Sequence, residues 1–423
     1  MDTQGIYDLK AVQQNAQNVT VFKNHLRQYV KIRPKNQRPF WAYGNTIEIP
    51  LLGQGLDYIN FAGSSLVVEM ELVNLNDAQP YPDNVEMLFG MCGLIRRYQL
   101  RAGAADIEDI DHYGRFMWLQ MMGHAAITIN ETESLVNPFS NDTWNRTANQ
   151  NHRTFKVPLI TMFEKAGYVP IYNIAEDLVL RLGLANPNDW LRGSGNTGGI
   201  PNTASYRVRD AYFLADGMSA TSGGQLSDQP FRFHTHTSFG RVETVPEGDS
   251  ILERYVYDLK KTSMKKWIGM FAREKQVDQQ NTIEDGMESR ANTDDFQYGF
   301  FLGGQPFPFK ETIKTPLDAF YQYKKYFNRQ DAIGNADAGV VHYRNNFLID
   351  ATEQHDFQRF YPCAVFDKLD QTGKVISGID TERYDIELQI EANTDQLEVA
   401  RLFSYFTWDV IVTIIGGEIK LED

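Results

Sequence analysis

Two histidines, His234 and His236, are the residues whose types and spacing come closest to a metal-binding pattern. Side chains two positions apart leave the same face of a β-strand, so both imidazoles would point the same way. A zinc site needs further protein ligands, and no third ligand is evident nearby in the sequence. We therefore interpret both histidines as ordinary polar residues of a strand and predict no metal site.

A glycine-rich segment, GSGNTGG at 193–199, has the composition of a phosphate-binding loop. Such loops end in Lys followed by Ser or Thr and lead into a helix, where backbone amides hold the phosphate. The sequence has neither the Lys-Ser/Thr ending nor a helical pattern after it. The segment is therefore predicted to be a surface loop.

Acidic residues gather in two places, one with Asp106, Glu108 and Asp109 and the other with Glu387 and Glu391. Two carboxyl groups that face each other across a cleft can act as general acid and general base. The first set falls at the start of a predicted helix and the second on the solvent face of a predicted strand, where acidic side chains need no catalytic role. The motifs G-x-S-x-G and H-E-x-x-H are absent from the sequence. We predict that the protein is not an enzyme and has no catalytic, cofactor-binding or metal-binding residues.

The two cysteines, Cys92 and Cys363, are far apart in the sequence, and neither has a catalytic signature around it. This cysteine usage excludes a disulfide framework and favours folding in a reducing intracellular compartment. The start of the chain, MDTQGIYDLK, lacks the apolar core of a secretion signal. The four N-x-Ser/Thr sequons are therefore expected to stay unglycosylated. They begin at Asn18, Asn130, Asn141 and Asn145.

The net charge of -14 limits the partners of the chain. Proteins that wrap nucleic acid carry an excess of Lys and Arg, which replaces counterions on the phosphates. Direct, sequence-specific nucleic-acid binding is therefore not expected. No apolar run approaches the ~20 residues that span a bilayer. Aromatic residues make up 13% of the chain, as is common where wide β-surfaces are covered.

The elements that position these residues are predicted to be β-strands, and residues 177–184 give the strongest signal. Leu178, Leu180, Leu182 and Leu184 alternate with other residues, whereas helical spacing would scatter them around a cylinder. We predict a half-buried strand of an antiparallel sheet, and residues 384–391 alternate as regularly. Further strands are predicted at 46–50, 65–73, 95–101, 155–159, 206–214, 251–259, 267–271, 296–302, 357–366 and 402–415.

Three segments depart from this alternation. The apolar spacing within 106–122 predicts a helix with Asp106 as its N-cap, and residues 315–326 also have helical character. Near the start of the chain, apolar residues at roughly helical spacing predict either a short amphipathic helix that docks on a neighbour or a frayed terminus. These residues are Val12, Val19, Phe22, Leu26 and Val30.

The chain of 423 residues is too long for one β-sandwich and suits two of roughly 200 residues each. Residues 215–230, rich in Gly, Ser and Asp, are predicted to contain the domain boundary. We predict an N-terminal arm or helix over 1–40, a first sandwich over 41–225 and a second sandwich over 226–423. The polar stretches 186–205 and 276–295 are predicted to be loops.

Four segments resemble, in their order and spacing, the double jelly-roll major capsid proteins of viruses with adenovirus-like shells. The likeness is greatest to the polinton, adintovirus and bidnavirus types, and it covers most of residues 40–423. The segments are TIEIPLLGQGLDYINFAGSSLVVEMELVN, IRRYQLRAGAADIEDIDHYGRFMWLQMM, FKVPLITMFEKAGYVPIYNIAEDLVLRLGL and YGFFLGGQPFPF.

This resemblance implies an all-β fold of two tandem eight-stranded jelly-roll β-sandwiches with short inserted helices. It implies a major capsid protein of the virion, in which three two-lobed copies form a pseudo-hexameric, homotrimeric capsomer of an icosahedral shell. The implied partners are other copies, penton or minor capsid proteins, and an internal membrane or inner layer. Contacts between copies are expected at the helix over 106–122 and at Trp190, Phe307 and Tyr321. The loops 186–205 and 276–295 are expected on the outer surface.

Two other functions stay open from the residues alone. A β-sandwich protein of this composition also suits a carbohydrate-binding or receptor-binding spike, and a virus can use such a fold in a minor capsid component. The sequence lacks the repetitive stalk of a spike. Its double length also disfavours a vertex protein, which usually needs a single roll.

Overall fold

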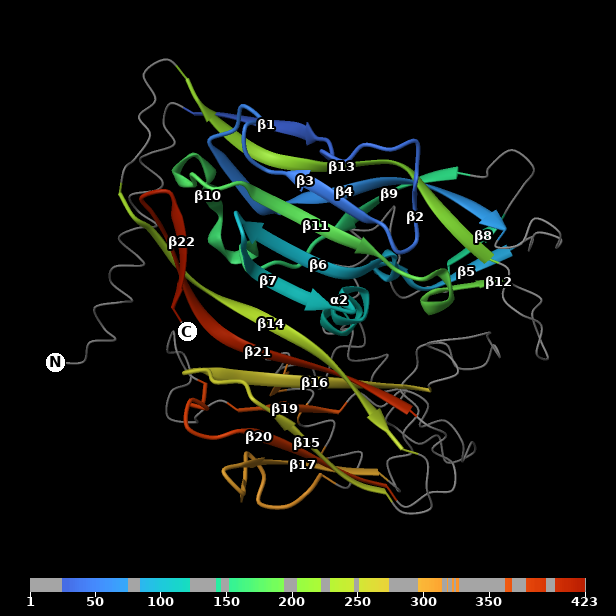
Figure 1. The fold of residues 1–423 in the computed structure, drawn as a ribbon, viewed down its shortest axis with the longest axis vertical. Helices are drawn as coiled ribbons and strands as arrows, with labels where there is room; N and C mark the ends of the chain where they lie inside the picture. The colour runs from blue at the N-terminus through green and yellow to red at the C-terminus, as the bar shows by residue number, and fades with distance from the viewer. Residues whose placement is uncertain are drawn as a thin grey trace, which may run out of the picture.

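The computed structural model describes residues 25–74, 84–121, 142–145, 152–193, 204–221, 229–246, 251–273, 296–313, 318, 322, 325–326, 362–366, 378–392 and 400–422. These residues form five β-sheets. Figure 1 shows the first half of the chain, coloured blue to green, above the second half, coloured yellow to red.

The strand order of the first half is that of a jelly roll. Its eight main strands are β1 (His25–Ile32), β3 (Thr46–Pro50), β4 (Tyr58–Asn74), β6 (Ile95–Ala102), β7 (Ala105–Asp111), β9 (His152–Pro158), β11 (Leu178–Leu184) and β13 (Ala204–Ala220). One sheet has the order β1-β13-β4 with β9 paired to β4, and the other has the order β3-β11-β6-β7. The first strand therefore pairs with the eighth, the second with the seventh, the third with the sixth and the fourth with the fifth. A long antiparallel hairpin rolled into two sheets gives this pattern.

The second half repeats the same strand order. Its eight main strands are β14 (Phe231–Val245), β15 (Ile251–Tyr257), β16 (Met264–Arg273), β17 (Phe296–Leu302), β18 (Gln305–Pro306), β19 (Cys363–Val365), β20 (Ile386–Ala392) and β21 (Ala400–Ile415). The two sheets have the orders β14-β21-β16-β19 and β15-β20-β17-β18. The prediction of an all-β fold with two tandem jelly rolls is therefore confirmed.

Shorter strands extend these sheets or form a sheet of their own. The strands β2 (Trp41–Ala42), β10 (Tyr168–Pro170) and β22 (Glu418–Glu422) lengthen the sheets, while β5 (Asn84–Met91), β8 (Asp142–Asn145) and β12 (Leu191–Gly193) form a small sheet. These last three lie in the connections from the third to the fourth, the fifth to the sixth and the seventh to the eighth strand of the first roll. In an antiparallel roll such connections leave at one end, and Figure 1 shows β5, β8 and β12 together at the right.

The strand predicted at 177–184 is confirmed in β11, where Leu178, Leu180, Leu182 and Leu184 are all buried. β11 lies between β3 and β6, so its leucine face packs into the core of the first roll. Burying each leucine stabilises the fold by roughly 2 kcal/mol. The apolar face predicted for 65–73 is likewise buried in β4, with Leu66, Val68, Met70 and Leu72.

The helix predicted at 106–122 is correct only in its second half. Its first half is the strand β7, and the helix α2 spans Tyr113–Met121. The register between β6 and β7 shifts at one point, and two consecutive side chains, Ile107 and Glu108, are both buried. A β-bulge of this kind interrupts the two-residue alternation, so the apolar spacing imitates that of a helix.

The helix predicted near the start of the chain is wrong for residues 25–32, which form β1, paired with β13 along its whole length. Leu26 and Val30 are four positions apart and therefore share a face of a strand as well as a face of a helix. The spacing could not distinguish the two. β1 is the first strand of the first roll, although it lies in the range expected for an arm. Val12, Val19 and Phe22 lie outside the described residues.

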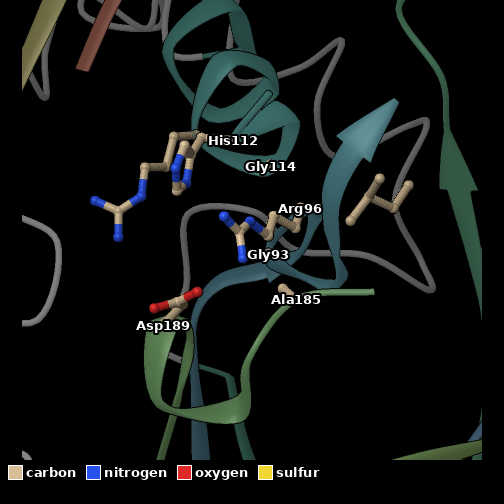
Figure 2. A pocket seen from close by; sticks show the side chains of 8 residues that line it. Gly93, Arg96, His112, Gly114, Ala185 and Asp189 are labelled. Atoms are coloured by element: carbon tan, nitrogen blue, oxygen red, sulfur yellow. The ribbon is translucent and has the colours of Figure 1, made fainter. Parts of the chain in front are cut away.

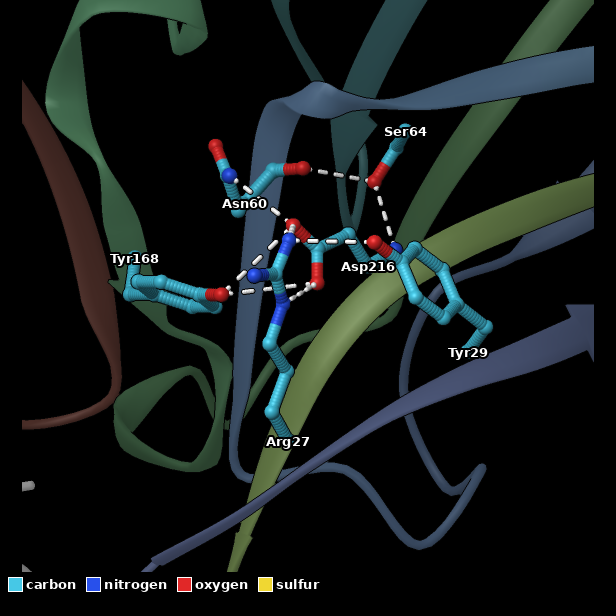
Figure 3. A network of polar contacts seen from close by, with 6 residues as sticks. All are labelled: Arg27, Tyr29, Asn60, Ser64, Tyr168 and Asp216. Atoms are coloured by element: carbon cyan, nitrogen blue, oxygen red, sulfur yellow. Dashed lines mark hydrogen bonds and ion pairs between the residues drawn. The ribbon is translucent and has the colours of Figure 1, made fainter.

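A buried carboxylate, Asp216, ties β1 to β13 and β4 (Figure 3). The Arg27 guanidinium donates to it twice, from Nε to Oδ1 and from Nη2 to Oδ2, each at 2.8 Å. Asn60 Nδ2 donates to Oδ2 at 3.0 Å, and the Asp216 amide donates to Ser64 Oγ at 3.0 Å. Asp216 is fully buried, so the bidentate pair supplies the opposite charge that a buried carboxylate needs.

Other predicted elements differ at their edges. The strand predicted at 206–214 continues to Ala220, so the predicted boundary segment begins inside β13, and the second roll begins at Phe231. The loop predicted at 186–205 contains β12, and residues 194–203 and 274–295 lie outside the described part. Within 357–366 a strand is described only for Cys363–Val365. Within 315–326 the described residues are helical, namely Asp318, Gln322, Lys325 and Tyr326.

Candidate functional site at the seam between the two rolls

The two rolls meet along a seam where β7 and the turn before the 3-10 helix η3 (Glu164–Ala166) face β14. Glu108 of β7 accepts a hydrogen bond from the Met162 amide at 3.0 Å in its own roll. It accepts a second from the Thr237 hydroxyl at 3.4 Å in the other roll. The Thr235 hydroxyl donates to the Met162 carbonyl. Buried polar groups of both rolls therefore satisfy one another across the seam.

Burial raises the pKa of Glu108 to about 8, although the hydrogen bonds from the Met162 amide and the Thr237 hydroxyl oppose the shift. These two donors are neutral groups, which stabilise an ionised carboxylate less than a cation would. The carboxyl group is therefore mostly protonated at neutral pH. The seam holds an acid in its neutral form at the point where the rolls meet.

The helix α2 forms a second part of the seam, against β21. The Tyr405 hydroxyl donates to the His112 carbonyl at 2.9 Å, and the Tyr405 ring packs on Phe116 with 5.5 Å between centroids. The Arg115 guanidinium lies 4.0 Å from the centre of the Phe403 ring. His112 has a φ of 49°, in the left-handed region that is unfavourable for residues with a Cβ. This strained junction between β7 and α2 turns the helix onto the second roll.

Two further hydrogen bonds join the rolls. Gln120 Nε2 donates to the Tyr326 hydroxyl at 2.7 Å, and the Ala175 amide donates to the Gly417 carbonyl at 2.9 Å. The contacts across the seam come from separate elements of both rolls. The rolls are therefore held as one two-lobed block and not as two domains on a linker.

Residues expected to contact other copies lie inside the chain instead. Trp190 is fully buried, with its ring 5.3 Å from that of Tyr206, and Phe116 of α2 is buried in the seam. The expectation is therefore wrong for Trp190 and for the buried face of α2. Phe307 is partly buried against the core, and Tyr321 lies outside the described residues.

A small cavity lies beside α2 (Figure 2). Its volume is about 20 Å³, and its lining includes Gly93, Arg96, His112 and Asp189. This is room for about one water molecule, whereas small-molecule sites usually enclose ~300 Å³ or more. Burial lowers the pKa of His112 to about 3, so its imidazole is neutral. The cavity is a packing feature of the junction and is too small for a substrate.

The acidic residues singled out in the sequence do not converge. Asp106 and Asp109 form ion pairs with arginines of β6, whereas Glu108 between them is buried in the seam. Asp106 is therefore not a helix N-cap. Glu387 and Glu391 are half-exposed on β20 in the second roll. Neither set forms a facing pair of carboxyl groups.

The remaining sequence features also lie apart. Gly193 ends β12, and the rest of the glycine-rich segment is outside the described residues. Cys92 and Cys363 are buried free thiols in different rolls, and burial raises the pKa of the Cys363 thiol, which keeps it from acting as a nucleophile. Of the four sequon asparagines, only Asn145 is described, as the last residue of β8.

The two histidines gain a third neighbour in the fold. His234 and His236 lie on β14, and Asp409 lies opposite His236 on β21. Asp409 Oδ1 is 3.0 Å from His234 Nε2 and 3.7 Å from His236 Nε2. The same oxygen is 3.3 Å from Lys265 Nζ, and the Ser263 hydroxyl donates to Oδ2 at 2.6 Å. No third ligand lies near the histidines in the sequence, but the fold places Asp409 beside both of them.

The protonation states in this cluster follow from its surroundings. Burial, and then the charge of Lys165, lowers the pKa of His236 to about 3, while Asp409 opposes the shift. Burial by itself would raise the pKa of Asp409, but hydrogen bonds with His234 and Ser263 outweigh it and hold the pKa below its usual value. At neutral pH the cluster therefore contains a neutral imidazole and a carboxylate.

Sequence spacing could not reveal Asp409, which is 175 positions from His234. Only the pairing of the first and last strands of a jelly roll brings the two together. One signal was available, because Asp409 is the single charged residue in the mostly apolar run 402–415. An acid in such a strand calls for a partner.

No protein-family model matches the sequence, and no curated protein sequence matches it. Solved structures match it in fold. The PBCV-1 virus capsid has a TM-score of 0.61 and 14% identity, covering 95% of this chain and 97% of that chain. The Faustovirus major capsid protein has a TM-score of 0.55 and 8% identity, covering 92% and 90% of the two chains. The mavirus major capsid protein has a TM-score of 0.54 and 10% identity, covering 93% and 90%.

The chain therefore has the double jelly-roll fold found in viral major capsid proteins, over nearly its whole length. Among the described residues, no helix has both the length and the apolar character to cross a lipid bilayer.

Proposed function

We propose that this chain is the major capsid protein of an icosahedral virus and that three copies form a pseudo-hexameric capsomer. The proposal rests mainly on one observation, two rolls of identical strand order joined in a single block. The fold match with capsid proteins over nearly the whole of each chain supports it. In this function the protein is a structural component of the virion and not an enzyme.

The two-lobed shape explains how a trimer can act as a hexagon. Each copy contributes two lobes of the same topology, so three copies around a threefold axis contribute six. Such a capsomer packs in a hexagonal lattice only if the two lobes keep a fixed relation. The hydrogen bonds and aromatic contacts of the seam supply this rigidity.

One end of the block suits the outer surface of the shell. The first strands of both rolls, β1 and β14, run toward the right in Figure 1, where β5, β8 and β12 also lie. β16 pairs antiparallel with β21, as β14 does, so β16 runs in the same direction and ends on the same side. We assign this end to the outside, because connections vary more freely at a surface than the strands that they join.

Contacts between copies require exposed apolar surface, and the most exposed large apolar side chains among the described residues lie on β1 and β15. Leu26 and Tyr29 of β1 are 59% and 61% exposed, and Leu252 and Val256 of β15 are 60% and 51% exposed. Leu252 and Val256 share a face of β15, whereas Leu26 and Tyr29 leave opposite faces of β1. Exposed apolar side chains mark interaction sites where they lie together. We assign these strands to contacts between copies, in place of α2 and Trp190.

The sequence resemblance supports a finer proposal about the lineage. We infer a capsid of the polinton, adintovirus or bidnavirus type, with penton or minor capsid proteins as further partners and an inner layer or internal membrane beneath. The net charge of -14 favours protein partners over direct contact with the genome. The two free, buried thiols are consistent with folding in a reducing compartment before assembly.

The assembly state of the purified chain tests this function. We expect a trimer by sedimentation at micromolar concentration, and hexagonal outlines, arrays or shells in negatively stained images. The double variant Leu252→Glu/Val256→Glu should sediment as a monomer, whereas the control Leu421→Glu, at another exposed apolar position, should remain trimeric. A wild-type chain that is monomeric at micromolar concentration contradicts the proposal.

A further inference from the structure

Three side chains that can bind a metal ion converge where β14 pairs with β21. His234 and His236 come from the first strand of the second roll and Asp409 from its last. Their ligand atoms all lie within 4.8 Å of one another. Two imidazoles and one carboxylate form a ligand set that zinc uses when its fourth position is left to water.

The spacing of Asp409 Oδ1 from the two histidine nitrogens fits a tetrahedral ion. Zinc bonds of about 2.0–2.2 Å at tetrahedral angles place two ligand atoms roughly 3.4 Å apart. The distances from Asp409 Oδ1 to the two Nε2 atoms, 3.0 Å for His234 and 3.7 Å for His236, lie on either side of this value. The Nδ1 atom of His236 has no hydrogen-bond partner among the described residues, so little holds its ring against a small rotation.

The carboxylate is already oriented for this role. The Ser263 hydroxyl donates to Asp409 Oδ2 at 2.6 Å, which turns Oδ1 toward the histidines. A hydrogen bond of this kind fixes a metal-binding carboxylate and is part of most metal sites. The Asp409 side chain is 1% exposed and both histidine side chains are 25% exposed. An ion can therefore enter from the histidine side, where a water molecule can complete the coordination.

Lys265 competes for the same oxygen. Its Nζ lies 3.3 Å from Asp409 Oδ1, so in this structure the ammonium neutralises the carboxylate. A bound ion must displace this ammonium, and the long lysine stem allows the movement. After this movement the positive charge of Lys265 stays near the site and weakens metal binding. Removing this charge should therefore raise the affinity for the metal ion.

We propose that His234, His236 and Asp409 bind a divalent ion of the zinc type, which links the first strand of the second roll to its last. Between the two histidines lies Thr235, whose hydroxyl donates to Met162 of the first roll. The ion would therefore also stiffen the strand that forms the seam. This inference does not depend on the proposed function, since the three ligands belong to one copy of the chain.

A titration with Co²⁺ tests the site, because the visible absorption of cobalt reports its coordination geometry. The full chain is stripped with EDTA, dialysed and titrated with Co²⁺, then with Zn²⁺ as a competitor. We expect one equivalent of Co²⁺ with a tetrahedral spectrum, its displacement by Zn²⁺, and a Tm that rises with metal concentration. His234→Gln and His236→Gln should each abolish the spectrum. Lys265→Met should tighten binding by roughly tenfold or more.

Two controls make the result decisive. His152→Gln removes a histidine of the first roll whose Nε2 lies 3.9 Å from a carboxylate of Glu69, and it should change nothing. Tm values measured in EDTA show whether each variant keeps its fold, and Lys265→Met retains all three ligands and moves the affinity in the opposite direction. The inference is overturned if no saturable Co²⁺ spectrum forms, if the spectrum survives both histidine substitutions, or if Lys265→Met leaves the affinity unchanged.

Discussion

Asp216 in the first roll and Glu108 in the seam are both buried carboxyl groups, but their partners differ. Asp216 is held by the guanidinium of Arg27 through two hydrogen bonds of 2.8 Å. Glu108 is held by a backbone amide and a threonine hydroxyl, and burial raises its pKa to about 8. One carboxyl group is therefore paired with a cation, and the other is stabilised as a neutral group.

This difference follows from where the partners come from. Within the first roll, the pairing of β1 with β13 places the Arg27 guanidinium beside the carboxylate of Asp216. At the seam, Glu108 accepts hydrogen bonds from neutral groups of both rolls, so an ionised carboxylate there would be buried without an opposite charge. A neutral carboxyl avoids this cost while the seam is closed, and it ionises when the seam opens to water. The seam should therefore respond to pH more strongly than the sheets.

The largest expected effect comes from breaking the ion pair inside the roll. Arg27→Met removes both hydrogen bonds to Asp216 and leaves a fully buried carboxylate without its cation. We expect the greatest fall in Tm of the variants in this comparison, measured by calorimetry at pH 7. The control is Arg33→Met, because Arg33 pairs with Asp210 at 2.9 Å where both side chains are exposed. Exposed pairs contribute little, so equal losses in the two variants would contradict this account.

An intermediate effect, visible only as a pH dependence, is expected at Glu108. In the unfolded chain this group ionises near its ordinary pKa of 4.5, whereas in the folded chain it stays protonated until the pH approaches 8. Between these values the unfolded state releases the proton and the folded state does not. The free energy of unfolding therefore falls as the pH rises, by on the order of 5 kcal/mol at most, and the loss is complete above pH 8.

Glu108→Gln replaces the acid by a neutral amide of the same shape and should remove this slope. Urea unfolding at pH 5.5 and pH 8.5 should show the variant gaining stability relative to the wild type at the higher pH. The control Asp109→Asn changes the neighbouring carboxylate on the solvent side of β7, which pairs with Arg97. If the wild type and Glu108→Gln differ in stability by the same amount at both pH values, Glu108 is already ionised in the seam.

Alternation predicted many of the strands that have one buried face, but it gave no strand over β14 (Phe231–Val245). It succeeded in β11, where Leu178, Leu180 and Leu182 line the core, because a strand places every second side chain on the same face. It failed at β7, where a register shift buries Ile107 and Glu108 together. The spacing of apolar residues reflects only the local backbone. It therefore cannot predict an irregular pairing with a second strand.

The seam and the histidine cluster depend on pairings that no local pattern contains. Asp409 reaches the histidines only because the last strand of a roll pairs with its first. Trp190 lies in a polar stretch and suggested a surface contact, whereas the fold buries it completely beside Tyr206. Many strand positions could therefore be predicted from the sequence, although not those of β1, β7 and β14, whereas the residues that join strands and rolls could not.

The smallest expected effect compares a single hydroxyl in the seam with one inside a roll. Tyr405→Phe removes the donor to the His112 carbonyl, and Tyr206→Phe removes the donor to the Ala185 carbonyl. Each buried hydrogen bond contributes about 1 kcal/mol, so both variants should unfold globally with similar losses. Hydrogen exchange should distinguish them, because only Tyr405→Phe is expected to reduce the protection of α2 amides by opening the seam locally. If α2 is equally protected in both variants, the seam opens only when the whole chain unfolds, and the two rolls form a single cooperative unit.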